Sequence, residues 1–113
     1  MAMNCLFCAF ASGEIPAEKI ASNDRAFAIN DINPVAPTHV LIIPNSHHEN
    51  AAEVASASPE TLASIFALAS QVATTRELTG YRTVFNTGAS AGQSVFHVHL
   101  HLIAGRSLEW PPG

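Results

Sequence analysis

Three of the chain's six histidines, His97, His99 and His101, occupy alternate positions in the segment FHVHLHLIAG. Successive side chains of a β-strand point to opposite faces of a sheet. The spacing therefore predicts a strand over residues 94–105 that carries all three imidazoles on one face. The opposite face then carries the apolar side chains Val98, Leu100 and Leu102. Because an apolar strand face has to be covered, this strand must pair within a sheet that packs against a helix.

A long helix is predicted over residues 59–79. Ser58 is a suitable N-cap, Pro59 suits the first helical position, and Gly80 is able to end the helix in a left-handed conformation. Apolar residues recur at helical spacing and predict the face that covers the sheet. They are Leu62, Ile65, Phe66, Ala69, Val72 and Ala73.

The remaining strands are predicted from short apolar runs bounded by proline and polar residues. They cover residues 26–31, 39–44 and 81–86, and a short extended segment follows the turn at 14–20. The Ser-x-x-Glu pattern at 46–49 predicts the start of a short helical turn. With a short N-terminal helix around Cys5 and Cys8, residues 1–113 form a single α+β domain with a five-stranded antiparallel sheet.

The charge distribution argues against nucleic acid as a partner. The net charge is −4, and the five lysines and arginines are scattered rather than clustered. The apolar N-terminal segment has no basic residue before Lys19 and is too short to cross a bilayer, so no signal peptide or membrane attachment is expected. Two cysteines form no secreted disulfide framework, and the prediction is a cytoplasmic protein.

Two chemistries suit three histidines on one strand face. One is a metal site with three histidine ligands and a bound water; the other is a histidine nucleophile that attacks phosphorus. The preceding turn, NTGASAGQS at 86–94, supplies glycines and backbone amides that are able to surround an anion, together with Asn86 and Ser94. An anion cradle beside imidazoles favours phosphate chemistry.

The segment HVHLHLI resembles the histidine triad motif of the HIT family. The resemblance extends from FASGEIPAEKI through DINPVAPTHVLIIP and GQSVFHVHLHLIAGR to the final WPPG. It is similar to the Hint branch, which implies a HIT-like fold whose sheet continues across a homodimer. The implied activity is hydrolysis of purine nucleoside 5′-phosphoramidates. Related nucleotidyltransferases have glutamine at the third triad position, so His101 favours hydrolysis over group transfer.

The resemblance also implies roles for individual residues. His99 is the nucleophile, while His101, Asn86 and the Ser94 amide hold the phosphoryl oxygens. The Ser94 hydroxyl helps to protonate the departing amine, His97 completes the catalytic triad, and Gly92 and Gln93 shape the turn. Asp31, beside Ile32, accepts the ribose hydroxyls, although an ordinary turn-capping role is the alternative. His39 supports the hydrogen-bond network, and Trp110 reaches the partner's pocket. A purine slot is formed by Phe7, Phe10, Ile15, Ile29, Ile32 and Leu41.

Cys5 and Cys8 have two interpretations. They are either buried thiols in a short helix or half of a tetrahedral zinc site. The resemblance supplies His47 and His97 as the other two zinc ligands, with His48 as a rival for His47. Such a zinc ion is structural, since no cofactor is required for the histidine chemistry.

Two other functions remain open on the sequence. A dinucleoside polyphosphate hydrolase shares the triad, but that branch lacks the WPPG ending. A nucleotide-binding regulatory module with incidental turnover is the alternative that is not primarily an enzyme.

Overall fold

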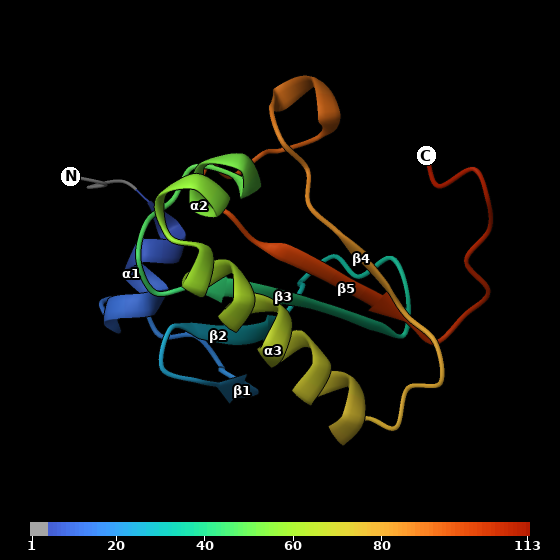
Figure 1. The fold of residues 1–113 in the computed structure, drawn as a ribbon. Helices are drawn as coiled ribbons and strands as arrows, with labels where there is room; N and C mark the ends of the chain where they lie inside the picture. Colours follow the sequence, from blue (N-terminus) through green and yellow to red (C-terminus); the bar gives the residue numbers. More distant parts are fainter. Residues whose placement is uncertain (1–4) are drawn as a thin grey trace.

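The computed structural model describes residues 5–113, so residues 1–4 of the apolar N-terminal segment lie outside the described part. Five antiparallel strands form one sheet in the order β1-β2-β3-β5-β4 (Figure 1). The strands are β1 (Ala21–Ser22), β2 (Ala26–Asn30), β3 (Thr38–Pro44), β4 (Arg82–Val84) and β5 (Leu100–Ala104). The helices are α1 (Leu6–Ser12), α2 (Ala51–Ala57) and α3 (Pro59–Thr75), with a short 3-10 helix, η1 (Ala89–Ala91). The α+β class and the five-stranded antiparallel sheet are confirmed.

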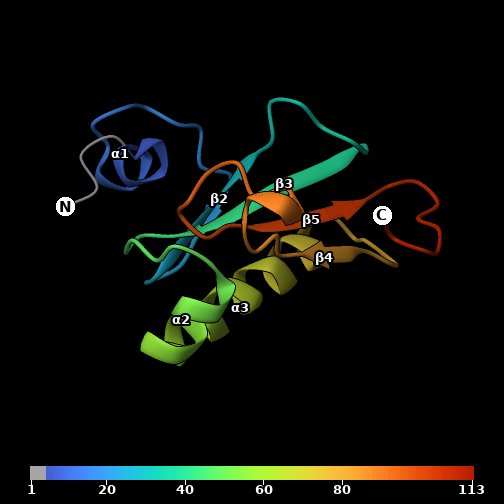
Figure 2. The same cartoon turned by 90° about the horizontal axis from the view of Figure 1, so that it is seen from above.

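The helices lie on both sides of this sheet. Seen from above in Figure 2, α2 and α3 lie on one side and α1 lies on the other. The α3 side holds the larger core, in which β3 and β5 contribute alternate residues. Its members are Ala26, Ala28, Val40, Ile42, Ile65, Leu68, Ala69, Val72, Leu100 and Leu102.

The opposite face carries a smaller apolar cluster and the polar chemistry. Phe7 of α1 packs there with Phe27, Leu41 and Ile43. Leu41 is the register partner of His101, so this face of β5 points toward the α1 side. The alternation in the sequence therefore separates a core face from a face that is available for function.

The end of α3 differs from its prediction. The helix stops at Thr75, four residues early, and Arg76 is its C-cap. Glu77 takes the left-handed conformation, with φ 55°, and the Leu78 amide returns to the Ala73 carbonyl at 3.0 Å. A non-glycine residue thus performs the role that was predicted for Gly80. Phe66 is also 44% exposed and packs edge-on against Phe85 instead of entering the core.

Strand β5 begins at Leu100, six residues later than predicted. At the N-terminal end of β5, the pairing with β3 stops at Leu100, which lies opposite Ile42. Extending that ladder would bring Val98 opposite Pro44, which has no N–H to donate. The Val98 amide donates instead to the His48 carbonyl at 2.7 Å. His97 and His99 consequently lie outside the strand, His97 in a bend and His99 in the irregular residues directly before Leu100.

Helix α2 begins later than the Ser-x-x-Glu pattern indicates. Its N-cap is Asn50, whose side chain accepts from the Glu53 amide at 2.9 Å. Ser46 instead lies against His48. No helix within residues 5–113 is long and apolar enough to cross a membrane.

Candidate functional site

The three triad histidines lie on the α1 side of the sheet. The His99 and His101 ring centroids are 5.0 Å apart, and Phe7 packs edge-on against both His97 and His99. His97 is fully buried, whereas His99 and His101 are partly exposed. Thus His97 is enclosed by protein, while its two neighbours remain accessible.

The backbone fixes the protonation of His99. Its Nδ1 lies 2.9 Å from the His97 carbonyl oxygen, and a carbonyl only accepts, so this nitrogen carries the ring proton. The other nitrogen, Nε2, keeps its lone pair. Burial lowers the pKa of His99 below its usual value, so the ring is neutral at pH 7. A neutral imidazole with a free lone pair is able to act as a nucleophile.

His101 contacts a fourth histidine, on β3. Its Nδ1 lies 2.9 Å from Nε2 of His39, which is itself buried. Burial, with His99 and His39 nearby, lowers the pKa of His101 to about 4. Burial likewise lowers the pKa of His97 to about 4. All three triad rings are therefore neutral at pH 7.

These lowered pKa values predict that the metal-free protein loses stability in acid. In the unfolded chain histidine titrates near pH 6.5, so between about pH 6.5 and 4 the unfolded state binds more protons than the folded state. The free energy of unfolding is expected to be constant just above pH 7 and to fall as the pH drops through this window. Urea unfolding in the presence of chelator measures this dependence. Constant stability from pH 7 to pH 5 would contradict the buried, neutral histidines.

The glycine-rich turn before β5 is organised by Gln93. Its side-chain oxygen accepts from the Gly88 amide at 2.9 Å, and its nitrogen donates to the Glu49 carbonyl at 2.7 Å and the Val95 carbonyl at 3.1 Å. Gly88 and Gly92 both have positive φ, 93° and 97°, which a side chain disfavours. At Gly92 the backbone conformation alone favours glycine, because a Cβ there would meet only the Asn86 side chain, at 3.9 Å.

Asn86 and Ser94 stand at the two ends of this turn. The Asn86 side chain lies beside Gly92, 3.9 Å from the position that a Cβ there would take. Ser94 is exposed to solvent. Both side chains thus flank the turn that leads into the triad.

A cavity of about 540 Å³ opens between α1 and β2. That volume lies within the range of small-molecule sites. Its lining is largely apolar and includes five of the six residues predicted for a purine slot. They are Phe7, Phe10, Ile29, Ile32 and Leu41. Ile15 is 42% exposed and is not part of the lining. Leu6, Pro16, Ala17 and Val95 also line it; their apolar character gave no signal that would distinguish them from core residues.

Asp31 stands at the rim of this cavity, and its carboxylate has two neighbours. One oxygen, Oδ1, accepts from the Asn33 amide at 2.8 Å, which is the turn contact that the alternative interpretation requires. The other, Oδ2, lies 3.4 Å from His39 Nε2. Asp31 therefore links the cavity to the histidine network.

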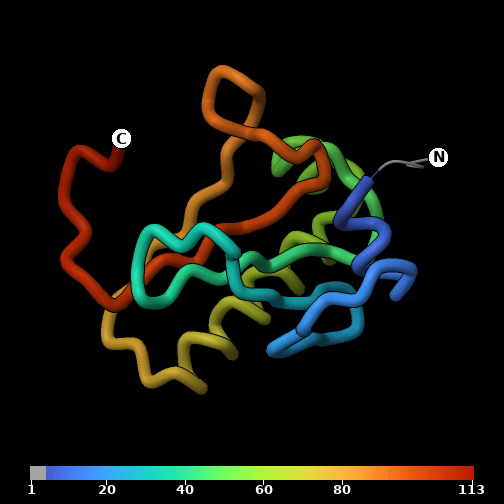
Figure 3. The backbone as a smooth tube through the Cα atoms, turned by 180° about the vertical axis from the view of Figure 1, so that it is seen from behind, coloured from blue at the N-terminus to red at the C-terminus, as the bar shows by residue number. Residues whose placement is uncertain are grey.

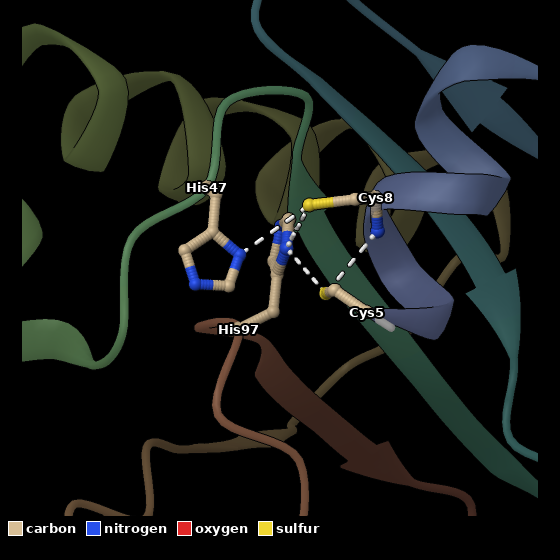
Figure 4. Close-up of side chains that lie close together, drawn as sticks. All are labelled: Cys5, Cys8, His47 and His97. Atoms are coloured by element: carbon tan, nitrogen blue, oxygen red, sulfur yellow. Dashed lines mark hydrogen bonds between the residues drawn. The ribbon is translucent and has the colours of Figure 1, made fainter. Parts of the chain in front are cut away.

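Cys5, Cys8, His47 and His97 converge from three segments of the chain, as Figure 4 shows. The Cys8 sulfur is 3.3 Å from His47 Nδ1 and 3.4 Å from His97 Nδ1, and the Cys5 sulfur is 3.3 Å from His97 Nδ1. All four ligand atoms lie within 4.8 Å of one another. His48 points elsewhere, with Nδ1 2.8 Å from Glu53.

The donor set of this cluster fits a tetrahedral zinc ion. Two sulfurs and two imidazoles are a common structural zinc set, and ligand atoms about 3.6 Å apart follow from zinc bond lengths near 2.1–2.3 Å. The His97 Nε2 lies 2.9 Å from the Pro44 carbonyl, which holds the proton there and aims the Nδ1 lone pair at the sulfurs. Burial, reinforced by Cys5, raises the pKa of the Cys8 thiol to about 11, so ionising both sulfurs requires a nearby cation.

Trp110 lies on the C-terminal tail that follows β5. It is 82% exposed and does not line the cavity. Figure 3 shows the C-terminal tail and the N-terminal helix at opposite sides of the molecule. The Glu109 carbonyl accepts from Arg82 at 3.0 Å, which ties the tail to β4 at the edge of the sheet.

Comparison with known proteins gives consistent matches. The HIT domain family model matches residues 12–108. A HIT family hydrolase from Legionella pneumophila has a TM-score of 0.91 and 46% identity, over 97% of this chain and 100% of that one. A 14 kDa zinc-binding protein of Zea mays is 42% identical over 103 residues, 88% of this chain and 80% of the relative. A histidine triad nucleotide-binding protein from Candida albicans has a TM-score of 0.80 and 30% identity, over 95% and 82% of the two chains.

Proposed function

The chain belongs to the HIT family, and from this premise we propose that it is a hydrolase of purine nucleoside 5′-phosphoramidates. The observation that carries the proposal is His99, a neutral ring whose proton is held by the His97 carbonyl. A glycine turn suited to an anion precedes it in the chain, and Phe7, which packs against its ring, lines an apolar cavity of suitable size for a nucleobase. The similar Legionella and Candida proteins, described as a hydrolase and a nucleotide-binding protein, support this proposal.

The reaction that we infer has two displacements at phosphorus. The His99 Nε2 lone pair attacks the α-phosphorus, the P–N bond breaks, and the amine leaves with a proton that the solvent-exposed Ser94 hydroxyl donates and regains from water. Water then attacks the nucleotidyl-histidine, which releases the nucleoside monophosphate and restores His99. His101, Asn86 and the Ser94 amide stabilise the charge on the phosphoryl oxygens during both steps.

Steady-state kinetics test this substrate class. We expect kcat/KM for adenosine 5′-phosphoramidate to exceed that for diadenosine polyphosphates by about tenfold or more. A preference for the polyphosphates would support a dinucleoside polyphosphate hydrolase instead. Tight nucleotide binding without product from either substrate in a single-turnover assay would support a regulatory module.

For Asp31 we propose contact with the ribose hydroxyls. Asp31→Asn keeps an oxygen for the Asn33 turn contact but loses the charge, so it separates ribose binding from turn formation. Affinity for a ribonucleoside monophosphate is expected to fall about tenfold, with little change for the 2′-deoxy analogue. Calorimetric titration of both nucleotides measures this difference. Unchanged affinity for both nucleotides would assign Asp31 to the turn alone, and equal losses for both would likewise contradict a contact with the 2′-hydroxyl.

The cysteine–histidine cluster is proposed as a structural zinc site. Cys5, Cys8, His47 and His97 would hold the ion, and the closed four-ligand set leaves no position for substrate. Zinc would fix α1 to the segment that carries His97 and so support the Phe7 wall of the cavity. No step of the reaction depends on it. The half-buried thiols of this site suit the reducing cytoplasm, where we place the protein.

A homodimer is proposed in which the sheet continues across two subunits. Strand β4 is an edge of the five-stranded sheet, and Tyr81 and Trp110 nearby are 46% and 82% exposed. Sedimentation equilibrium is expected to give twice the chain mass. Deleting residues 109–113 is expected to change the relative rates for different amine leaving groups while affinity for the monophosphate is unchanged. A monomer, or identical relative rates, would contradict this arrangement.

A further inference from the structure

The ring proton of His39 is placed by a backbone amide outside the triad. The Val35 N–H donates to His39 Nδ1 at 3.1 Å. A nitrogen that accepts a hydrogen bond carries no proton, so the neutral His39 ring is protonated on Nε2. The Val35 peptide is anchored on its other side, because its carbonyl accepts from Arg106 Nε at 2.9 Å.

The tautomer of His39 in turn determines the tautomer of His101. The protonated Nε2 of His39 lies 2.9 Å from His101 Nδ1 and 3.4 Å from Asp31 Oδ2. The shorter contact is the stronger hydrogen bond, so His39 donates mainly to His101. His101 then accepts at Nδ1 and carries its own proton on Nε2.

We propose that His39 is a positioning residue that, set by the Val35 amide, holds His101 as an Nε2–H donor toward the phosphoryl group. The role toward phosphate rests on the proposed function. An Nε2–H donates to an oxygen whose negative charge grows as the P–N bond breaks, whereas the opposite tautomer would present a lone pair to that oxygen. The tautomer therefore decides whether His101 stabilises or repels the charge.

The same geometry argues against a second metal site. Asp31, His39 and His101 place their ligand atoms within 4.8 Å of one another, as a metal site would. A metal there needs a lone pair on His39 Nε2, and the Val35 hydrogen bond places a proton on that nitrogen. These three side chains are therefore better arranged for His39 to fix the tautomer of His101 than for binding a metal ion.

The first test removes the Val35 amide N–H that donates to His39 Nδ1. Val35→Pro deletes the N–H, whereas the control Val35→Ala keeps the N–H and removes the valine side chain beyond Cβ. Two-bond ¹H–¹⁵N spectra of the nucleotide-free protein report the tautomer of each histidine. We expect Nε2–H at His39 and His101 in wild type and Val35→Ala, and a substantial Nδ1–H population at both in Val35→Pro. An Nδ1–H tautomer at His101 in the wild type would overturn the proposal.

A second pair of variants covers the case in which Val35→Pro does not fold. His39→Gln retains an N–H that is able to donate to His101, while His39→Leu retains only the volume. We expect kcat to fall about 100-fold in His39→Leu and about tenfold or less in His39→Gln, with KM for phosphoramidate within about threefold of wild type in both. Equal kcat in the two variants would overturn the positioning role.

The spectra and the kinetics separate this inference from the proposed function. Expected tautomers in a protein that hydrolyses no phosphoramidate would support the role of His39 in fixing the His101 tautomer and overturn the proposed function. Phosphoramidate turnover with the opposite His101 tautomer would support the proposed function and overturn that role of His39.

Discussion

Replacing His99 with asparagine is expected to lower kcat for adenosine 5′-phosphoramidate by about four orders of magnitude, since the variant has no nucleophile. Affinity for AMP is expected to stay within about threefold, because the cavity and the glycine turn are unchanged. His99, the middle histidine of the three, is partly exposed and packs edge-on against Phe7, so asparagine creates little strain. Stopped-assay kinetics and calorimetric titration of AMP measure the two quantities.

The partly buried His48 offers a matched control for this experiment. It lies in the loop before α2 with its ring against Glu53 and Ser46, so His48→Asn removes an imidazole without touching the triad. We expect this control to retain wild-type kcat. A His99→Asn variant with activity within tenfold of wild type would remove His99 from the role of nucleophile.

The second large effect is expected from zinc. Purified protein should contain one zinc per chain, and Cys8→Ser should abolish stoichiometric binding, because Cys8 contacts both histidines of the cluster. Removing zinc with chelator is expected to lower the free energy of unfolding by about 3 kcal/mol when free zinc had exceeded its dissociation constant by about 300-fold. Elemental analysis and urea unfolding with and without chelator measure both effects.

Two neighbouring histidines sharpen this test. His47→Asn removes a ligand of the proposed zinc site, whereas His48→Asn removes the adjacent ring that faces Glu53. Only the first is expected to weaken zinc binding, by about tenfold or more. Metal-free protein from a chelator-free purification would favour two buried thiols instead, as would equal effects of the two variants.

The alternation of polar and apolar residues was sufficient to predict the two faces of the sheet. Leu100 and Leu102 occupy the core beneath α3, as the alternation in the histidine segment predicts, while His101 lies on the opposite face with Leu41. Such a period follows directly from strand geometry, so the order of residues determines it. The same reasoning identified the α+β class and the five strands.

The ends of elements depended on interactions that local patterns do not contain. Strand β5 starts late because Val98 donates to the His48 carbonyl, a contact across 50 residues of sequence. Helix α3 ends early because Glu77 takes a left-handed conformation that is uncommon outside glycine. Neither the contact with the His48 carbonyl nor the left-handed conformation of Glu77 is indicated by the residues around these two ends.

Within the candidate site, the sequence suggested the side chains but not the backbone groups that orient them. Backbone atoms fix the protonation of His97, His99 and His39: the Pro44 and His97 carbonyls and the Val35 amide. Backbone groups are the same at every position, so no residue type marks them in the sequence. Distinguishing His47 from His48 likewise required the direction in which each ring points.

The central claim is that phosphoramidate hydrolysis proceeds through a nucleotidyl-His99 intermediate, and the configuration at phosphorus tests it most directly. The substrate is one diastereomer of an adenosine 5′-phosphorothioamidate, hydrolysed in ¹⁸O-labelled water, with the product configuration determined from its ¹⁸O position. Two in-line displacements each invert phosphorus, so the account predicts net retention. Net inversion would show that water attacks the substrate directly, and it would contradict His99 as the covalent nucleophile.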